Sequence, residues 1–149
     1  MPNLLLAGYF GEGNLGDDAI MLGFVEGMSG SGCDFMVMSG APEETFRLHG
    51  INAIPRRDMK LYENAVKSCD AVVFPGGSIF QDVTSVKSVA YYQALIKKAK
   101  SAGKKVIMLG QGVGPLTSFL GKRMASAAFN AADVVAVRDP QSEIGRAHV

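Results

Sequence analysis

Short apolar runs alternate with longer segments of helical periodicity along this chain, and that alternation restricts its fold more than any other feature. Runs such as Leu4–Ala7 and Val106–Leu109 contain no polar residue, which is typical of parallel strands buried on both faces. The predicted strands are Asn3–Tyr9, Asp34–Met38, Ala53–Pro55, Ala71–Phe74, Lys105–Leu109 and Val134–Val137. The predicted helices are Asp17–Met28, Glu43–His49, Met59–Cys69, Val86–Ala102 and Phe119–Ala132. The pattern predicts an α/β fold with a doubly wound, mostly parallel, Rossmann-like sheet.

Size, charge and cysteine content exclude several classes of function. The 149 residues fit one domain, and a net charge of +1 gives no reason to expect a nucleic-acid partner. Cys33 and Cys69 form no Cys-x-x-Cys pair and have no neighbouring histidine, so neither a metal site nor a disulfide framework is expected. No apolar run approaches the roughly 20 residues of a membrane span, and we expect a cytoplasmic protein.

A group of lysines at the end of the fourth predicted helix has two interpretations. The group consists of Lys97, Lys98, Lys100, Lys104 and Lys105. The simpler interpretation is a solvated helix face. The alternative is attraction to an anionic membrane surface, which would bring the protein to the inner face of the membrane by peripheral association.

The first glycine-rich stretch lies between the first predicted strand and the first predicted helix. Gly11, Gly13 and Gly16 match the GxGxxG pattern of dinucleotide-binding turns, in the expected strand-turn-helix setting. Asp17 and Asp18 follow at once, where their charges would repel a pyrophosphate and would suit the hydroxyls of a sugar better. A purely structural interpretation also stands, in which Asp17 caps the helix and the glycines only make a turn.

Two further glycine-rich stretches follow predicted strands. Residues 74–82, with the sequence Phe-Pro-Gly-Gly-Ser-Ile-Phe-Gln-Asp, add polar side chains to tandem glycines after the fourth strand. Residues 110–116 follow the fifth strand and offer Gln111 as their obvious polar side chain. Because the carboxyl ends of parallel strands share one edge of the sheet, the three stretches are predicted to be loops that line one crevice. Simple glycine turns are the alternative interpretation of each stretch.

The end of the sequence carries one more polar pair. Arg138 and Asp139 follow the last predicted strand, where the arginine either clamps a carboxylate or phosphate or pairs locally with the aspartate. Residues 143–149 read like a translated sequencing-adapter fragment, so we expect a domain over residues 1–142 and a non-native tail over residues 143–149. A natural frayed terminus is the alternative.

Four stretches, taken in order, resemble the polysaccharide pyruvyl transferase family. They are Gly11-x-Gly13-Asn14-Leu15-Gly16-Asp17-Asp18, then Gly76-Gly77-Ser78-Ile79-Phe80-Gln81-Asp82, then Gln111-Gly112-Val113-Gly114-Pro115, and finally Val137-Arg138-Asp139 with Ser142. Their order and spacing are similar to those of bacterial cell-wall pyruvyl transferases of the CsaB type. The resemblance spans about residues 3–142.

The resemblance implies a transferase that moves an enolpyruvyl-derived group from phosphoenolpyruvate to two hydroxyls of one sugar, which forms a pyruvate ketal on a cell-surface polysaccharide. It also implies a GT-B-like architecture of two Rossmann-like halves with the active site between them. This sequence would supply the N-terminal half, expected to be inactive alone. Its partners would be a C-terminal domain, phosphoenolpyruvate and a saccharide or lipid-linked oligosaccharide acceptor. Such an enzyme would serve cell-wall or exopolysaccharide biogenesis without a cofactor.

The resemblance further implies which residues face the substrates. The chemistry needs an acid for the enol methylene, a base for the attacking hydroxyl, and cations for the phosphate and carboxylate of the donor. The catalytic candidates are Asp17, Asp82 and Arg138. The substrate-binding candidates are Gly13, Asn14, Gly16, Asp18, Gly76, Gly77, Ser78, Gln81, Gln111 and Gly112. Pro75 stands where the family usually has a third glycine, which leaves one backbone amide fewer for a ligand.

Three other functions stay open at this point. A GT-B-like glycosyltransferase half would bind a nucleotide sugar in the same crevice. A dinucleotide-binding module would hold a cofactor at the first glycine-rich stretch, although the adjacent acidic pair argues against it. A non-catalytic interaction domain would tolerate mutation of the crevice residues.

Overall fold

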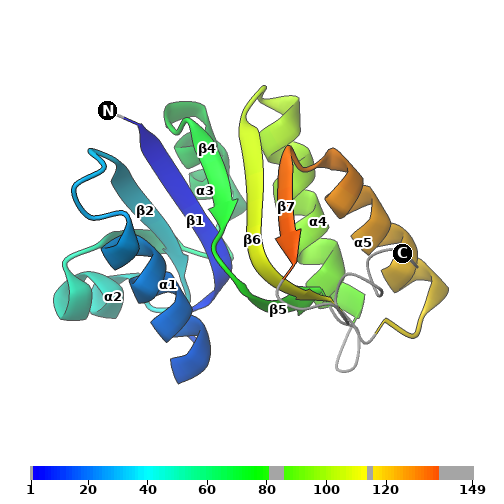
Figure 1. Cartoon of the computed structure of the whole chain (residues 1–149), viewed down its shortest axis with the longest axis horizontal. Coiled ribbons are helices and arrows are strands. Elements are labelled where there is room, and N and C mark those ends of the chain that lie inside the picture. Colours follow the sequence, from blue (N-terminus) through cyan, green and yellow to red (C-terminus); the bar gives the residue numbers. More distant parts are fainter. Residues whose placement is uncertain (1, 81–85, 114–115, 138–149) are drawn as a thin grey trace.

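The computed structural model describes residues 2–80, 86–113 and 116–137, and Figure 1 shows strands and helices alternating along them. The strands are β1 (Asn3–Phe10), β2 (Asp34–Ser39), β3 (Asn52–Pro55), β4 (Ala71–Phe74), β5 (Gly77–Phe80), β6 (Lys105–Val113) and β7 (Val134–Val137). The helices are α1 (Leu15–Gly27), α2 (Pro42–His49), α3 (Met59–Ser68), α4 (Val86–Ser101) and α5 (Phe119–Ala131). Each of the strand pairs found within these ranges is parallel. The predicted α/β fold with a parallel, Rossmann-like sheet is confirmed.

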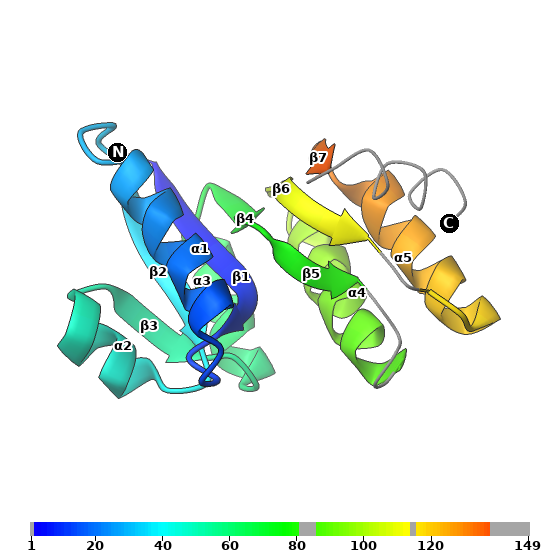
Figure 2. The ribbon, with the colours of Figure 1, turned by 60° about the horizontal axis from the view of Figure 1, so that its bottom comes forward.

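The order in which the chain adds strands to the sheet reverses near the middle of the sheet. The order is β3-β2-β1-β4-β6-β5, and β7 also pairs with β6. Phe74 of β4 pairs with Met108 and Gly77 of β5 pairs with Gln111, at the same offset, so β5 continues β4 along one side of β6. Figure 2 shows this continuation beside β6. The chain first winds outward from β1 to β3 and then returns to the other side of β1, which creates a switch point between β1 and β4.

Two apolar layers hold helices against opposite faces of the sheet. Leu5 and Phe74 belong to the layer under α3, α4 and α5, whereas Leu6 and Val73 belong to the layer under α1. Neighbouring residues of one strand face opposite ways, so all-apolar runs are what a sheet covered on both faces requires. In Figure 1, α1 lies in front of the sheet and α3 and α4 lie behind it. Among the described residues, no helix is long and apolar enough to cross a membrane.

Two predicted loops prove to be strands. Residues 77–80 form β5, and β6 runs on to Val113, so Gln111 and Gly112 lie in a strand. The prediction that β6 would end at Leu109 was therefore wrong. Glycine lowers the local preference for a strand, but Gln111 pairs with Gly77 on one side and with Val137 on the other, and these long-range pairings decide the outcome.

The first helix begins two residues earlier than predicted. It starts at Leu15, and the cap is Asn14, whose side-chain Oδ1 accepts a hydrogen bond from the Asp17 amide at 3.1 Å. The structural interpretation of Asp17 as the helix cap was therefore wrong, since Asn14 fills that role. The carboxylate of Asp17 is left for other interactions. The remaining helix boundaries move by at most one residue, which is ordinary for helix ends.

Candidate functional site

The carboxyl edge of the sheet, next to the switch point between β1 and β4, gathers Asn14, Asp17, Asp18 and Gln111 from the polar residues predicted for the site. The β1–α1 loop, the junction of β4 with β5 and the far end of β6 all lie at this edge. In open α/β sheets, ligands bind in the crevice at such a switch point. We refer to this region, built by residues 11–18, 74–77 and 109–112, as the edge crevice, a name that rests on its place in the topology.

Side chains of the β1–α1 loop and of the first turn of α1 bind two of the backbone amides there. Asp18 Oδ1 accepts from the Gly11 amide at 2.9 Å, and Asn14 Oδ1 accepts from the Asp17 amide. A dinucleotide-binding turn needs such amides to hold a pyrophosphate. Because aspartate and asparagine side chains occupy these two amides, the loop does not favour a dinucleotide, in agreement with the charge argument from the sequence.

Asp17 lies against the tandem glycines of the β4–β5 junction, although the two are distant in sequence. A Cβ added to Gly77 would lie 3.0 Å from Asp17 Oδ1, and one added to Gly76 would lie 2.7 Å from Cγ2 of Ile20. The missing side chains therefore let the first turns of α1 approach the junction closely. Burial, and secondarily the neighbouring charge of Asp18, raise the pKa of the Asp17 carboxyl. A carboxyl with a raised pKa is suited to holding and releasing a proton.

Gln111 forms an internal link rather than an open contact. Its side chain is fully buried, and Nε2 donates to the carbonyl oxygens of Phe74 at 3.1 Å and Leu109 at 3.0 Å. The amide thereby fixes the end of β4, where the chain bends into β5, against β6. Its Oε1 is buried without a hydrogen-bond partner, so one buried acceptor in β6 stays unsatisfied.

A buried arginine at the same edge was missed in the sequence. Arg56 directly follows β3 and is 6% exposed. Its guanidinium lies 3.4 Å from Glu12 Oε1 and 2.9 Å from the Tyr92 hydroxyl. The signal that could have found it is its position after a strand, the same criterion that selected the glycine-rich stretches. No motif marks it, because its surroundings come from β1, the β1–α1 loop and α4.

The comparison with protein families decides the assignment. The model of the family described as polysaccharide pyruvyl transferase matches residues 14–146, which is most of the chain. The chain belongs to the polysaccharide pyruvyl transferase family. The match begins at the cap of α1 and includes Asp17, the β4–β5 junction and Gln111. None of the curated proteins compared with this chain matches it.

In this pyruvyl transferase family member, the structure brings part of the predicted site together. Exposed positions in or next to the β1–α1 loop are Gly13, Asn14 and Gly16, with Asp17 and Asp18 half-buried. Buried positions are Gly76, Gly77, Gln111 and Gly112. Ser78 lies in β5. The side chain of Ser78, and Gln81, Asp82 and Arg138 altogether, lie outside the described residues, so their predicted roles stay predictions.

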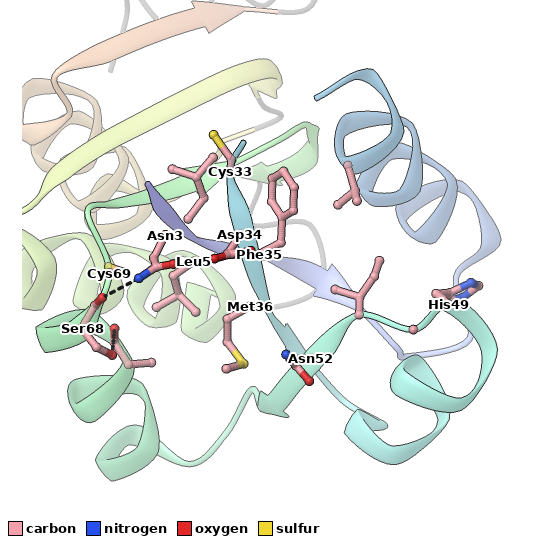
Figure 3. Close-up of a pocket in the computed structure, with 15 residues that line it drawn as sticks. Asn3, Leu5, Cys33, Asp34, Phe35, Met36, His49, Asn52, Ser68 and Cys69 are labelled. Carbon is pink, nitrogen blue, oxygen red and sulfur yellow. Dashed lines mark hydrogen bonds between the residues drawn. The ribbon is translucent and has the colours of Figure 1, made fainter. Parts of the chain in front are cut away.

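A cavity lies at the opposite end of the sheet. It measures about 750 Å³ and is bordered by the starts of β1, β2 and β3, with Asn3, Asp34 and Asn52 among its lining residues (Figure 3). Cys33 and Cys69 are also present, but among the described residues no three His, Cys, Asp or Glu side chains gather where they could hold a metal ion. Its place at the amino ends of the strands, away from the switch point, separates it from the edge crevice.

Replacement of Asn14 by alanine is expected to destabilise the protein by about 1 kcal/mol, because the α1 cap is lost. Thermal unfolding should detect this as a fall in Tm of about 2–4 °C. Asp58→Ala is the matched control, since Asp58 caps α3 through a bond of the same length, 3.1 Å, to the Leu61 amide. An unchanged Tm for Asn14→Ala beside a lowered Tm for Asp58→Ala would contradict the capping role of Asn14.

Proposed function

We propose that this chain is the N-terminal half of an enzyme that transfers the enolpyruvyl group of phosphoenolpyruvate to two hydroxyls of one sugar, giving a pyruvate ketal. Membership of the polysaccharide pyruvyl transferase family supports the transferase chemistry. The edge crevice, with its carboxylates close to glycine backbone, supports the choice of a polyhydroxyl acceptor. The proposed acceptor is a saccharide or lipid-linked oligosaccharide of a cell-wall or exopolysaccharide pathway, reached from the cytoplasm.

The proposed reaction needs one group that moves protons within the crevice. The methylene carbon of phosphoenolpyruvate gains a proton, two sugar oxygens bond to the neighbouring carbon, and the bond from that carbon to the phosphate oxygen breaks. The two hydroxyl protons released balance the proton gained by carbon and the one taken up with the departing phosphate. A side chain that is protonated in the resting enzyme and ionised after donation would speed the first step.

The observation that carries the proposal is the environment of Asp17. Burial against Gly77, together with the charge of Asp18, raises the pKa of this carboxyl and keeps its proton to higher pH than in an exposed aspartate. We propose Asp17 as the proton donor to the methylene carbon. Arg138 and basic residues of a second domain are the proposed partners of the donor phosphate, because the Arg56 side chain is too enclosed to meet it.

The test is phosphate release from phosphoenolpyruvate by the product of the whole reading frame, with a panel of saccharide and lipid-linked acceptors. Release that depends on an acceptor, and an acceptor product that gains the mass of a pyruvate ketal, is the expected result. Binding of a nucleotide sugar without any acceptor-dependent phosphate release would overturn the proposal in favour of a glycosyltransferase. Unchanged activity after mutation of Asp17 would instead remove that residue from the chemistry.

A further inference from the structure

Arg56 is a buried cation to which the proposed reaction gives no direct role. Only 7% of its side chain is exposed. Burial of a guanidinium is unfavourable unless the group is paired and hydrogen-bonded. Yet Nε has no hydrogen-bond partner, and the contact with Glu12 is 3.4 Å long. A side chain this enclosed does not meet a substrate, so any role in turnover acts through the groups around it.

Three tyrosine rings enclose the guanidinium. Arg56 Cζ lies 5.1, 4.8 and 5.9 Å from the ring centroids of Tyr9, Tyr91 and Tyr92. All three distances fall within the range of cation–π attraction. The rings of Tyr91 and Tyr92 meet edge to face, with centroids 4.9 Å apart. We call Tyr9, Tyr91 and Tyr92 the tyrosine cage; its members come from β1 and α4.

Hydrogen bonds connect the cage to three segments of the edge. Arg56 Nη2 donates to the Tyr92 hydroxyl at 2.9 Å, and the Tyr91 hydroxyl donates to the carbonyl oxygen of Arg56. Nη1 reaches Glu12 in the β1–α1 loop. A guanidinium only donates, so the Tyr92 oxygen accepts and its own proton is directed elsewhere. One side chain therefore joins the β1–α1 loop, the end of β3 and α4.

Asp17 is an electrostatic neighbour of the cage. Burial is the main cause that raises the pKa of Tyr92 to about 12, and the Asp17 carboxylate contributes to the rise. Glu12 lies five residues before Asp17 in the same loop and first helical turn. Glu12 and Tyr92 are therefore the two groups through which Arg56 can influence Asp17.

We propose that Arg56 is a positioning residue whose guanidinium holds Glu12 and Tyr92 in fixed places and thereby sets the position of Asp17 over Gly77. This inference rests on the proposed function, in which Asp17 moves a proton. Apolar side chains could fill the same volume, whereas a guanidinium stacks on aromatic faces and donates in several directions from one plane. Lysine shares the charge but neither the plane nor the fork of donors.

The first test compares Arg56→Lys and Arg56→Gln with the wild type, all as whole proteins. We expect kcat for acceptor-dependent phosphate release to fall by about 10²-fold in both variants, as misplacement of a reacting group does. The KM for phosphoenolpyruvate should change little, because Arg56 does not touch the donor. A lower Tm with an unchanged kcat of the folded protein would show a merely structural role and overturn the proposal.

The second test needs no turnover and reads the cage directly. The 149 residues of this chain contain no tryptophan and four tyrosines, of which three form the cage, so the cage contributes a large part of the near-ultraviolet circular dichroism of these residues. Both Arg56 variants should lose part of this signal. Arg57→Gln is the matched control: Arg57 is 74% exposed and lies 3.7 Å from Glu12, so its loss should leave the spectrum and kcat unchanged.

The outcomes separate the two proposals. Loss of the tyrosine signal in the Arg56 variants, beside a wild type that releases no phosphate with any acceptor, would count against the proposed function and leave the cage standing. An unchanged spectrum in Arg56→Gln would overturn the cage. An equal loss of kcat in Arg57→Gln would also overturn the proposal, because it would trace the effect to the charge of Glu12 alone.

A milder variant, Tyr92→Phe, keeps the proposal testable if the Arg56 variants misfold. Tyr92→Phe removes one hydroxyl and keeps the ring that packs edge to face with Phe74. If Arg56 acts through Tyr92, Tyr92→Phe lowers kcat, and adding Arg56→Lys lowers it no further than the worse single variant. Losses that multiply in the double variant would show independent actions and overturn the proposal.

Discussion

Replacement of Asp17 by asparagine is expected to lower kcat for acceptor-dependent phosphate release by about 10²–10⁴-fold, the usual contribution of a positioned proton donor. Asparagine keeps the size and the polar surface of the side chain but cannot release a proton. The Asn14 side-chain bond to the amide of residue 17 is retained, so α1 remains capped. Steady-state kinetics at saturating phosphoenolpyruvate measures the loss.

The same variant should gain stability at pH values above the raised pKa of Asp17. The pKa of Asp17 is raised on folding, so the folded state binds its proton more tightly than the unfolded chain does. The stabilisation from this proton is complete below the ordinary aspartate pKa and is lost as the pH rises through the raised value. Above the raised pKa the ionised Asp17 is unfavourable in the fold, and Asp17→Asn removes that cost. A higher Tm than wild type above this pKa, which disappears in acid, is expected.

Two further variants test whether the effects of Asp17→Asn are specific to this carboxyl. Glu26→Gln removes an exposed carboxylate from the same helix and should leave both kcat and Tm unchanged. Asp18→Asn removes the like charge beside Asp17, so the pKa of Asp17 falls and the decline of rate with rising pH moves to lower pH. Equal activity of Asp17→Asn and wild type would contradict the assignment. A pH profile that Asp18→Asn does not move would show that another group donates the proton.

The fold was predictable because burial of the sheet on both faces requires every residue of a central strand to be apolar. Leu5 and Leu6 are adjacent, face opposite layers, and are both fully buried, so the run that contains them must be wholly apolar. No such run of apolar residues predicts the extension of β6 to Val113. It depends on the pairing of Gln111 with Gly77 and Val137, which a local pattern of glycines does not reveal.

The sequence predicted which segments lie at the candidate site, but not the contacts of their side chains. Parallel strands bring their carboxyl ends together, and that rule placed Asp17 at the same edge as Gly77. It could not foresee that the Asp17 carboxylate faces Gly77, or that the amide of Gln111 turns inward to two carbonyl groups. Both facts arise from side-chain packing between segments that are distant in sequence.

Arg56 is a residue whose environment could not be predicted from the sequence. A single arginine after a short strand matches no motif, and exposed arginines are common. Its burial follows from Tyr9, Tyr91 and Tyr92, which are all distant from Arg56 in the sequence. Pairs and clusters of this kind become visible only when the topology has brought β1, β3 and α4 together.

Gly11→Ala is expected to have a large effect on stability, about 2–4 kcal/mol of the free energy of unfolding. Gly11 has a φ of +67°, and a Cβ there would overlap Oγ of Ser39 and lie 2.9 Å from the backbone nitrogen of Ala41. Ser39 cannot simply turn aside, because its hydroxyl is bonded to Thr45 Oγ1 at 2.8 Å and accepts from the Ala41 amide at 2.9 Å. The β1–α1 loop and the segment after β2 must therefore move apart.

Gly50→Ala separates the two causes of this loss. Gly50 has the same φ of +67° at the end of α2, but a Cβ there would meet nothing within 4 Å. It should cost only the backbone strain, about 1 kcal/mol, and leave kcat unchanged. The excess loss in Gly11→Ala measures the close approach of the two loops. Because the displaced loop carries Glu12 and leads into Asp17, Gly11→Ala should also lower kcat. Equal losses of stability in the two variants, by denaturant unfolding, would show that the loops separate without cost and that their contact does not hold the crevice.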